Sequence, residues 1–108
     1  MAASKISSAA IDRAAVAGRG VVTHTPVTGS AALSDRCGGH IVLKAENLQR
    51  TGSFKIRGAM NKLSALGDDA VNGVTAGSAG NHAQAIAFAA RHTGVRCEIF
   101  VPSGAPLS

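Results

Sequence analysis

Residues 73–101 read GVTAGSAGNHAQAIAFAARHTGVRCEIFV, and this stretch decides the expected fold. A short apolar run over 73–76 leads into the turn 77–80, an alanine-rich segment over 81–92 and a second apolar run over 95–101. Gly94 separates the last two segments, and Pro102 stops the final run. The pattern predicts strand, turn, helix and strand. Such a βαβ unit has parallel strands and a right-handed crossover, so the chain is expected to be an α/β protein with a parallel sheet.

A second informative run precedes it, because residues 46–59 read ENLQRTGSFKIRGA. The turn signal at 51–53 is followed by apolar residues at three- and four-residue steps, which predicts a helix over about 54–66 that ends at Gly67. Ser53 is the expected N-cap, so Lys55 would lie in the first helical turn. The positive end of the helix dipole disfavours an ammonium group there, and partial desolvation would add to the effect. The neutral amine is the form that attacks carbonyl groups.

The rest of the chain shows weaker signals. Residues 8–18 are alanine-rich with helical spacing, residues 33–36 suggest a short helix, and residues 40–45 suggest a strand. At 108 residues the chain forms one domain at most. No apolar run approaches the length of a membrane span, and residues 1–20 do not resemble a secretory signal.

Composition narrows the class of protein. Hydrophobic residues make up 45% of the chain and aromatic residues only 3%, so the core must be built from small aliphatic side chains, as suits helices packed on a parallel sheet. The formal charge of +5 is spread along the chain without a basic run, which gives nucleic-acid binding little support. Neither Cys37 and Cys97 nor the histidines His24, His40 and His92 show metal-ligand spacing, so no metal is expected. Cys97 is expected to be a buried small hydrophobe, and a reducing cytoplasm fits the two cysteines.

Residues 47–59 resemble the pyridoxal-phosphate (PLP) lysine motif of the threonine/serine dehydratases, which are also called threonine ammonia-lyases. Residues 78–84, SAGNHAQ, match a second motif at the spacing of that family. Softer matches lie at 25–33 and 101–108. The family belongs to the fold-type II, tryptophan-synthase-β-like PLP enzymes. The resemblance implies a three-layer α/β fold around a parallel sheet, present here as an incomplete N-terminal portion that includes the βαβ unit.

The resemblance also implies residue roles. Lys55 would form the Schiff base with PLP and then remove the Cα proton of an amino-acid substrate. Phe54 would pack against the PLP ring, and Asn81 would meet its 3′-oxygen. The substrate carboxylate would be held by the loop that contains Ser78, Gly80, Asn81 and His82. The implied reaction is the dehydration and deamination of L-threonine or L-serine to a 2-oxo acid and ammonia.

Each of these residues also has a plain structural interpretation. Lys55 could be a solvated lysine whose stem covers apolar surface, and Phe54 could be core packing beside a helix start. Ser78 or Asn81 could be an ordinary helix cap. Against this, the strand-to-helix turn leaves backbone N–H groups unpaired at a positive helix end, which suits an anion. His82 is expected to contribute its backbone amide rather than its ring.

Ala79 departs from the pattern of the racemase members of the family, which have a second serine at that position as a base on the other cofactor face. A methyl group cannot move a proton, so Ala79 argues for dehydration and against efficient racemisation. A related PLP lyase that acts on another hydroxyamino acid stays open as an alternative.

The glycine-rich phosphate loop of the family and the residue that faces the pyridine nitrogen are expected later than Ser108. Residues 1–108 are therefore interpreted as the N-terminal portion of a longer enzyme, with parts of its large and small domains, and as inactive alone. The full-length enzyme is expected to be a cytoplasmic homo-oligomer without nucleic-acid or membrane partners. The alternative is a truncated, catalytically inactive fragment or a small α/β module that binds anions weakly.

Overall fold

The predicted βαβ unit is present in the computed structural model, which describes residues 6–106. It consists of strand β3 (Val74–Gly77), helix α4 (Asn81–Thr93) and strand β4 (Cys97–Phe100). The two strands pair in parallel, with Val74 opposite Cys97 and Gly77 opposite Phe100. The observed bounds differ from the predicted ones by one or two residues at several ends, since helix and strand ends are the least sharply encoded positions. Leu107 and Ser108, the end of the softer match over 101–108, lie outside the described residues.

The core forms where helix α3 (Lys55–Leu66) packs against α4, which also contacts both strands of the parallel pair. Ile56 is fully buried in this contact. Small alanine side chains on α4 let the two helices approach closely and leave aliphatic side chains to fill the space between them. The buried members of this core are Val21, Ile56, Ala59, Met60, Leu63, Ala85, Ile86, Ala89 and Ala90.

The helix ends follow the expected chemistry. Gly67 ends α3 at φ 49° and Gly94 ends α4 at φ 75°, both in the left-handed region that favours glycine. At the start of α3, Phe54 already has helical dihedral angles and makes no capping hydrogen bond, whereas Ser53 has an extended backbone. The Ser53 Oγ accepts a hydrogen bond from the Lys55 N–H at 3.4 Å, so the serine makes the capping contact that the sequence predicted.

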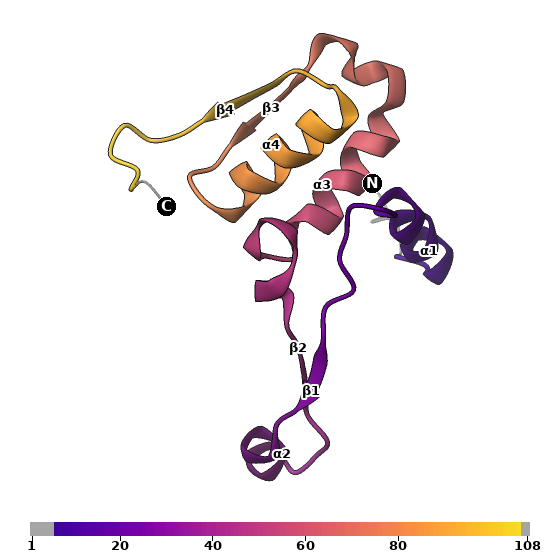
Figure 1. Cartoon of the computed structure of the whole chain (residues 1–108), viewed down its shortest axis with the longest axis vertical. Coiled ribbons are helices and arrows are strands. Elements are labelled where there is room, and N and C mark those ends of the chain that lie inside the picture. Colours follow the sequence, from indigo (N-terminus) through magenta and orange to yellow (C-terminus); the bar gives the residue numbers. More distant parts are fainter. Residues whose placement is uncertain (1–5, 107–108) are drawn as a thin grey trace.

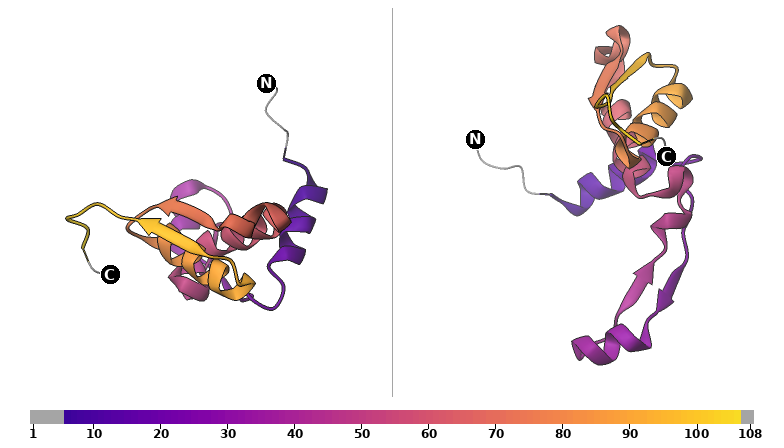
Figure 2. Two further views of the ribbon diagram at one scale, coloured as in Figure 1. Left: turned by 90° about the horizontal axis from the view of Figure 1, so that it is seen from above. Right: turned by 90° about the vertical axis from the view of Figure 1, so that its left-hand side faces the viewer.

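Residues 26–45 form an arm that projects away from this core (Figures 1 and 2). Strand β1 (Val27–Gly29) pairs antiparallel with β2 (Val42–Lys44), and helix α2 (Ala31–Cys37) lies at the tip. The predicted strand at 40–45 and short helix at 33–36 are therefore confirmed with changed bounds. The antiparallel pairing was not expected, because strand β1 has no alternating pattern that would have marked it in the sequence.

The remaining elements are one helix before the arm and three short 3₁₀ helices between the arm and β3. Helix α1 (Ser8–Ala17) packs against α3, which confirms the helix predicted at 8–18. Three short 3₁₀ helices were missed: η1 (Glu46–Leu48), η2 (Arg50–Gly52) and η3 (Gly67–Asn72). Runs of three to six residues with such mixed composition carry too little periodicity to be found from sequence.

We expect the isolated 108-residue chain to self-associate and to unfold without a sharp transition. Its radius of gyration is 16.7 Å, against about 13 Å for a compact domain of this length. The arm and the outer helix faces leave large apolar side chains exposed, and such surfaces and strand edges promote aggregation. Sedimentation velocity and a thermal melt followed by circular dichroism measure both properties. A monomeric chain with a sharp, reversible melt would contradict the prediction. The exposed side chains include Ile11, Val16, Val27, Val42, Leu43, Leu48, Val71, Phe100 and Val101.

Candidate active site

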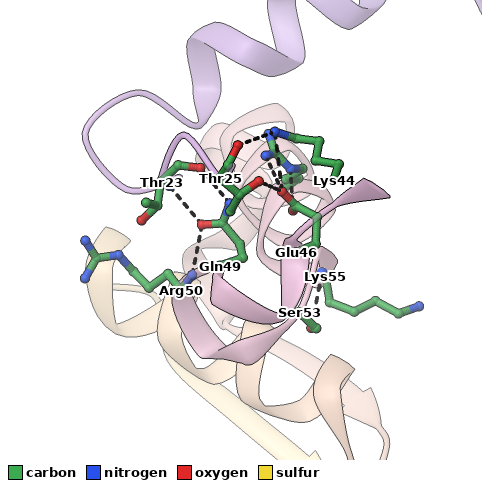
Figure 3. A network of polar contacts seen from close by, with 9 residues as sticks. Thr23, Thr25, Lys44, Glu46, Gln49, Arg50, Ser53 and Lys55 are labelled. Carbon is green, nitrogen blue, oxygen red and sulfur yellow. Dashed lines mark hydrogen bonds and ion pairs between the residues drawn. The ribbon is translucent and has the colours of Figure 1, made fainter. Parts of the chain in front are cut away.

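Lys55 is the first residue of α3, as predicted, and its side chain is exposed. The Nζ atom lies 5.3 Å from the centroid of the Phe54 ring, and no carboxylate of residues 6–106 forms an ion pair with it. In Figure 3 the side chain extends away from the polar network that surrounds Gln49 and Glu46. The amine is therefore placed where a second molecule can reach it. The partial desolvation considered from the sequence is absent in the described part of the chain.

Phe54 lies on the surface, with 59% of its area exposed. The interpretation of this residue as simple core packing is therefore wrong. A large aromatic face left in solvent beside an amine is a typical feature of a binding surface rather than of a core.

Glu46 joins the start of α3 to the base of the arm. Its carboxylate accepts hydrogen bonds from Arg57 Nε at 2.8 Å, from Arg57 Nη2 at 2.7 Å and from Thr25 Oγ1 at 2.5 Å. Lys44 Nζ lies 3.9 Å from the same carboxylate. The hydrogen bonds from Arg57 are the main cause that lowers the pKa of Glu46 to about 2, so the carboxylate is ionised at neutral pH. Because Arg57 is two residues after Lys55, this cluster anchors the first turn of the helix.

Gln49 fixes the loop just before that helix. Its side-chain amide bonds both backbone groups of Thr23, as Oε1 accepts from the Thr23 N–H at 2.8 Å and Nε2 donates to the Thr23 carbonyl at 2.8 Å. Oε1 also accepts from the Arg50 N–H at 2.9 Å (Figure 3). Neither Gln49 nor Glu46 was singled out from the sequence. Gln49 lies inside the matched run 47–59 and Glu46 directly precedes it, and this was the one available signal.

Ser78, Gly80, Asn81 and His82 lie on the connection from β3 to α4, as predicted. The Ser78 N–H continues the sheet by donating to the Phe100 carbonyl at 3.0 Å, and the Ser78 Oγ accepts from the Gly80 N–H at 3.2 Å. Gly80 is the N-cap of α4, so the interpretation of Ser78 or Asn81 as an ordinary cap is wrong. A glycine cap has no side chain to accept from the N–H groups of the first turn. Those donors remain available for an anion.

One open hollow of about 700 Å³ links the two halves of the site. Phe54, Lys55 and His82 line it at the starts of the two helices, and an apolar wall from α3, β3 and α4 continues it. Ser78, Gly80 and Asn81 are beside this hollow in the chain but do not line it. The structure thus brings the lysine and the α4 start to one surface without closing a pocket around them.

Further features of the described residues lie outside this surface. Residues 6–106 contain no group of three or more His, Cys, Asp or Glu side chains placed to hold a metal. His92 stacks on Phe88 with the ring centroids 6.5 Å apart, which is a packing role. Within the described part of the chain, no helix has the length and apolar character needed to span a bilayer. Cys97 is only half-buried, and burial is the main cause that raises the pKa of its thiol.

Residues 19–108 match the family model described as pyridoxal-phosphate dependent enzyme. The chain belongs to this family. It is 52% identical over 91 residues to L-threonine ammonia-lyase from Thermotoga maritima, a match that covers 83% of this chain and 23% of that protein. The resemblance to the threonine/serine dehydratases is thereby confirmed.

Solved structures place the chain in the same class. It superposes on a pyridoxal 5′-phosphate-dependent aspartate racemase with a TM-score of 0.83 and 35% identity, over 98% of this chain and 34% of that chain. It superposes on maize serine racemase with a TM-score of 0.80 and 39% identity, over 91% of this chain and 30% of that chain. The predicted fold-type II class is confirmed, with the chain as a partial α/β domain. The chain spans only about a quarter to a third of the proteins it matches.

The residues of this family member fit its cofactor. Lys55 offers a primary amine to an aldehyde, and Phe54 offers an exposed aromatic face to a flat ring. The α4 start offers unpaired N–H groups to a negatively charged oxygen. The arrangement therefore suits an aromatic aldehyde that bears anionic substituents.

Proposed function

We propose that residues 1–108 form the N-terminal portion of a PLP-dependent lyase that converts L-threonine or L-serine to a 2-oxo acid and ammonia. The observation that carries the proposal is the placement of Lys55 and the α4 start around one hollow. The similarity to L-threonine ammonia-lyase supports the choice of reaction. We propose that these residues alone are inactive, because the hollow is open and the relatives are about four times as long.

Each residue has a definite role in the proposed reaction. Bound PLP supplies an electron sink for the charge that develops on the substrate Cα. Lys55 would hold the cofactor and, once released from it, would take the substrate Cα proton on its Nζ. Phe54 would pack against the cofactor ring, and the Asn81 side chain would meet an oxygen of that ring. The β-hydroxyl would leave as water with the proton removed from Cα, and one water molecule would hydrolyse the resulting enamine to the 2-oxo acid and ammonia.

The loop before α4 binds the other end of the substrate in this proposal. Ser78, Gly80, Asn81 and His82 receive the substrate carboxylate, with backbone N–H groups as the donors. The glycine cap keeps those donors free, and the partial positive charge of the helix start favours an anion. Holding the carboxylate fixes the Cα–H bond relative to the Lys55 amine, which is the geometric requirement for proton transfer.

Racemisation is the second candidate, because the two superposed structures are an aspartate racemase and a serine racemase. Proton exchange on both faces of Cα requires a second base opposite Lys55. Ala79, at the position where the racemase members carry a serine, has only a methyl group. We therefore favour elimination over racemisation. If the substrate is neither threonine nor serine, another hydroxyamino acid is the nearest alternative.

Two further features belong to the same proposal. Cys37 and Cys97 are both unpaired, which fits a reducing cytoplasm. The exposed apolar surfaces of the arm and of α1 fit burial against the remainder of a longer chain and against other subunits of a homo-oligomer.

Reductive trapping tests the proposal in a full-length protein that contains these residues. The protein is loaded with PLP, reduced with borohydride and digested, and the modified lysine is located by mass spectrometry. We expect modification at Lys55 in preference to Lys44 and Lys62. In parallel, L-threonine and L-serine should give 2-oxo acid and ammonia, with little D-enantiomer. Uniform modification of the lysines would reject the assigned cofactor residue, and D-amino acid as the main product would favour the racemase.

A further inference from the structure

We propose that Gln49 is a positioning residue for Lys55: it clamps the loop before α3 to Thr23 and so sets the point from which the lysine side chain extends. The proposal rests on the proposed function for its catalytic consequence. The clamp itself is a property of this chain and can be tested without the cofactor.

The Gln49 side chain bonds one distant segment and its own sequence neighbour. The residue is buried, with 3% of its area exposed, and its Oε1 and Nε2 bond both backbone groups of Thr23 across 26 residues of sequence. The third bond, from the Arg50 N–H to Oε1, ties the clamp to the first residue of η2. A buried amide whose acceptor and donor both reach one distant residue holds the two chain segments in a single register.

The loop that follows is strained where it leaves the clamp. Thr51 has φ 64° and ψ 15°, a left-handed conformation that a β-branched residue rarely adopts. Its Oγ1 is buried and has no hydrogen-bond partner among the described residues. Strained backbone and unsatisfied polar atoms persist only where surrounding contacts over-determine them, and they concentrate at functional sites.

Those surrounding contacts are visible on both sides of Thr51. The Gly52 N–H donates to the Gln49 carbonyl at 2.8 Å, so the turn closes on the clamped residue itself. Arg50 Nε donates to the Val21 carbonyl at 2.8 Å, and its guanidinium lies 5.5 Å from the centroid of the Phe88 ring on α4. The loop is thus tied both to the segment before the arm and to the helix that begins at the carboxylate-binding loop.

Lys55 depends on this loop more than most lysines depend on their backbone. Its amine has no ion pair among the described residues and lies 5.3 Å from the centroid of the exposed Phe54 ring, so no ion pair fixes its position. The position of the amine therefore depends on where the loop that contains Thr51 places the Lys55 backbone. A displacement of about 1 Å at a reacting group can reduce a rate by on the order of a hundredfold.

The test uses the full-length protein with Gln49→Ala, and Gln49→Glu as the conservative variant. The glutamate can still accept hydrogen bonds from the N–H groups of Thr23 and Arg50, but it places an oxygen against the Thr23 carbonyl. Its effects should therefore lie between those of the parent and those of Gln49→Ala. Asn72→Ala is the matched control, because it truncates an exposed amide at the end of η3 that forms none of the bonds to Gln49. Met60→Ala is the control for general destabilisation, since Met60 is a buried core residue of α3 that does not line the hollow.

The first readout is amide hydrogen exchange in the PLP-free protein. We expect Gln49→Ala to accelerate exchange about tenfold in peptides that cover 50–57, with no change over 81–93. Met60→Ala should instead accelerate exchange in both regions, because it loosens the shared core. Unchanged exchange over 50–57 in Gln49→Ala would overturn the proposal whether or not the protein proves to be a PLP lyase.

The second readout is the rate and position of borohydride trapping of PLP. Gln49→Ala should trap PLP at Lys55 at least about tenfold more slowly than the parent and Asn72→Ala, with relatively more modification at Lys44 and Lys62. Met60→Ala should keep its preference for Lys55. Trapping in Gln49→Ala with the rate and selectivity of the parent would overturn the positioning role. A parent protein that does not trap PLP at Lys55 would reject the proposed function, and the exchange result would still decide the clamp.

Discussion

Lys55→Ala, placed in a full-length protein that contains these residues, is expected to reduce lyase activity by on the order of a thousandfold or more and to remove the covalent PLP site. The expected effect is large because one amine serves two purposes in the proposed mechanism, which are covalent binding of the cofactor and removal of the substrate Cα proton. No other lysine among the described residues lies at the start of a helix. Lys44 lies at the end of β2, and Lys62 lies in the interior of α3. The measurements are the steady-state rate of 2-oxo acid formation from L-threonine and the visible absorbance of the PLP-loaded protein.

Lys62→Ala is the matched control for this experiment. Lys62 lies seven residues further along the same helix, which places it two turns away on the same face. It also lines the same hollow and is exposed. We expect its removal to leave activity within about threefold of the parent, since it has neither the helix-start position nor the Phe54 neighbour. Activity that survives Lys55→Ala would reject the mechanism, and equal losses in the two variants would indicate a general effect of positive charge in the hollow.

Glu46→Gln is expected to destabilise the protein at neutral pH by about 2 kcal/mol and to have almost no effect near pH 2. The pKa of Glu46 is lowered from 4.5 to about 2 in the folded protein, mainly by the hydrogen bonds from Arg57. A carboxyl group with a lowered folded-state pKa stabilises the fold at pH values above its unfolded pKa. That stabilisation is lost as the pH falls from about 4.5 to about 2. The expected value of about 2 kcal/mol is smaller than the free energy that corresponds to the whole pKa shift of Glu46. The reason is that the Arg57 side chain is 42% exposed, so solvent screens the pair.

Urea unfolding of the full-length parent and of Glu46→Gln in the same full-length protein, at pH 6, 4 and 3, measures the difference in unfolding free energy. Glu98→Gln is the matched control, because Glu98 also pairs with an arginine, Arg96, but on the exposed surface of β4. Exposed pairs contribute less than about 1 kcal/mol, so this variant should change the unfolding free energy at neutral pH by less than Glu46→Gln does. A constant difference between the parent and Glu46→Gln across this pH range would contradict the electrostatic origin of the effect.

Much of the local structure follows from short sequence signals. The glycines at 67 and 94 predict the ends of α3 and α4, and the apolar runs on either side of α4 predict β3 and β4. The same signals place Lys55 at a helix start and Ser78–His82 at a strand-to-helix turn. Each is a property of a few consecutive residues, so each can be read without knowledge of the rest of the chain. Their bounds shift by one or two residues, because the ends of helices and strands are the least sharply encoded positions.

Other features depend on contacts between distant parts of the chain. The pairing of β1 with β2 and the clamp between Gln49 and Thr23 join segments that have no periodic relation to each other. Whether Phe54 faces solvent or the core depends on which surface of α3 is covered by α4. Residue types alone are compatible with either outcome at these positions.

The sequence by itself determined the family, the βαβ unit and the presence of an amine at a helix start, because these rest on motifs and periodicities that span a few turns of chain. Only the tertiary structure decided which residues hold that amine in place. The glycine N-cap at Gly80, the strained Thr51 and the clusters at Glu46 and Gln49 arise from packing of α3, α4 and the segment 21–25 against one another. Burial determines which polar groups must find partners, and burial is established only when the chain has folded.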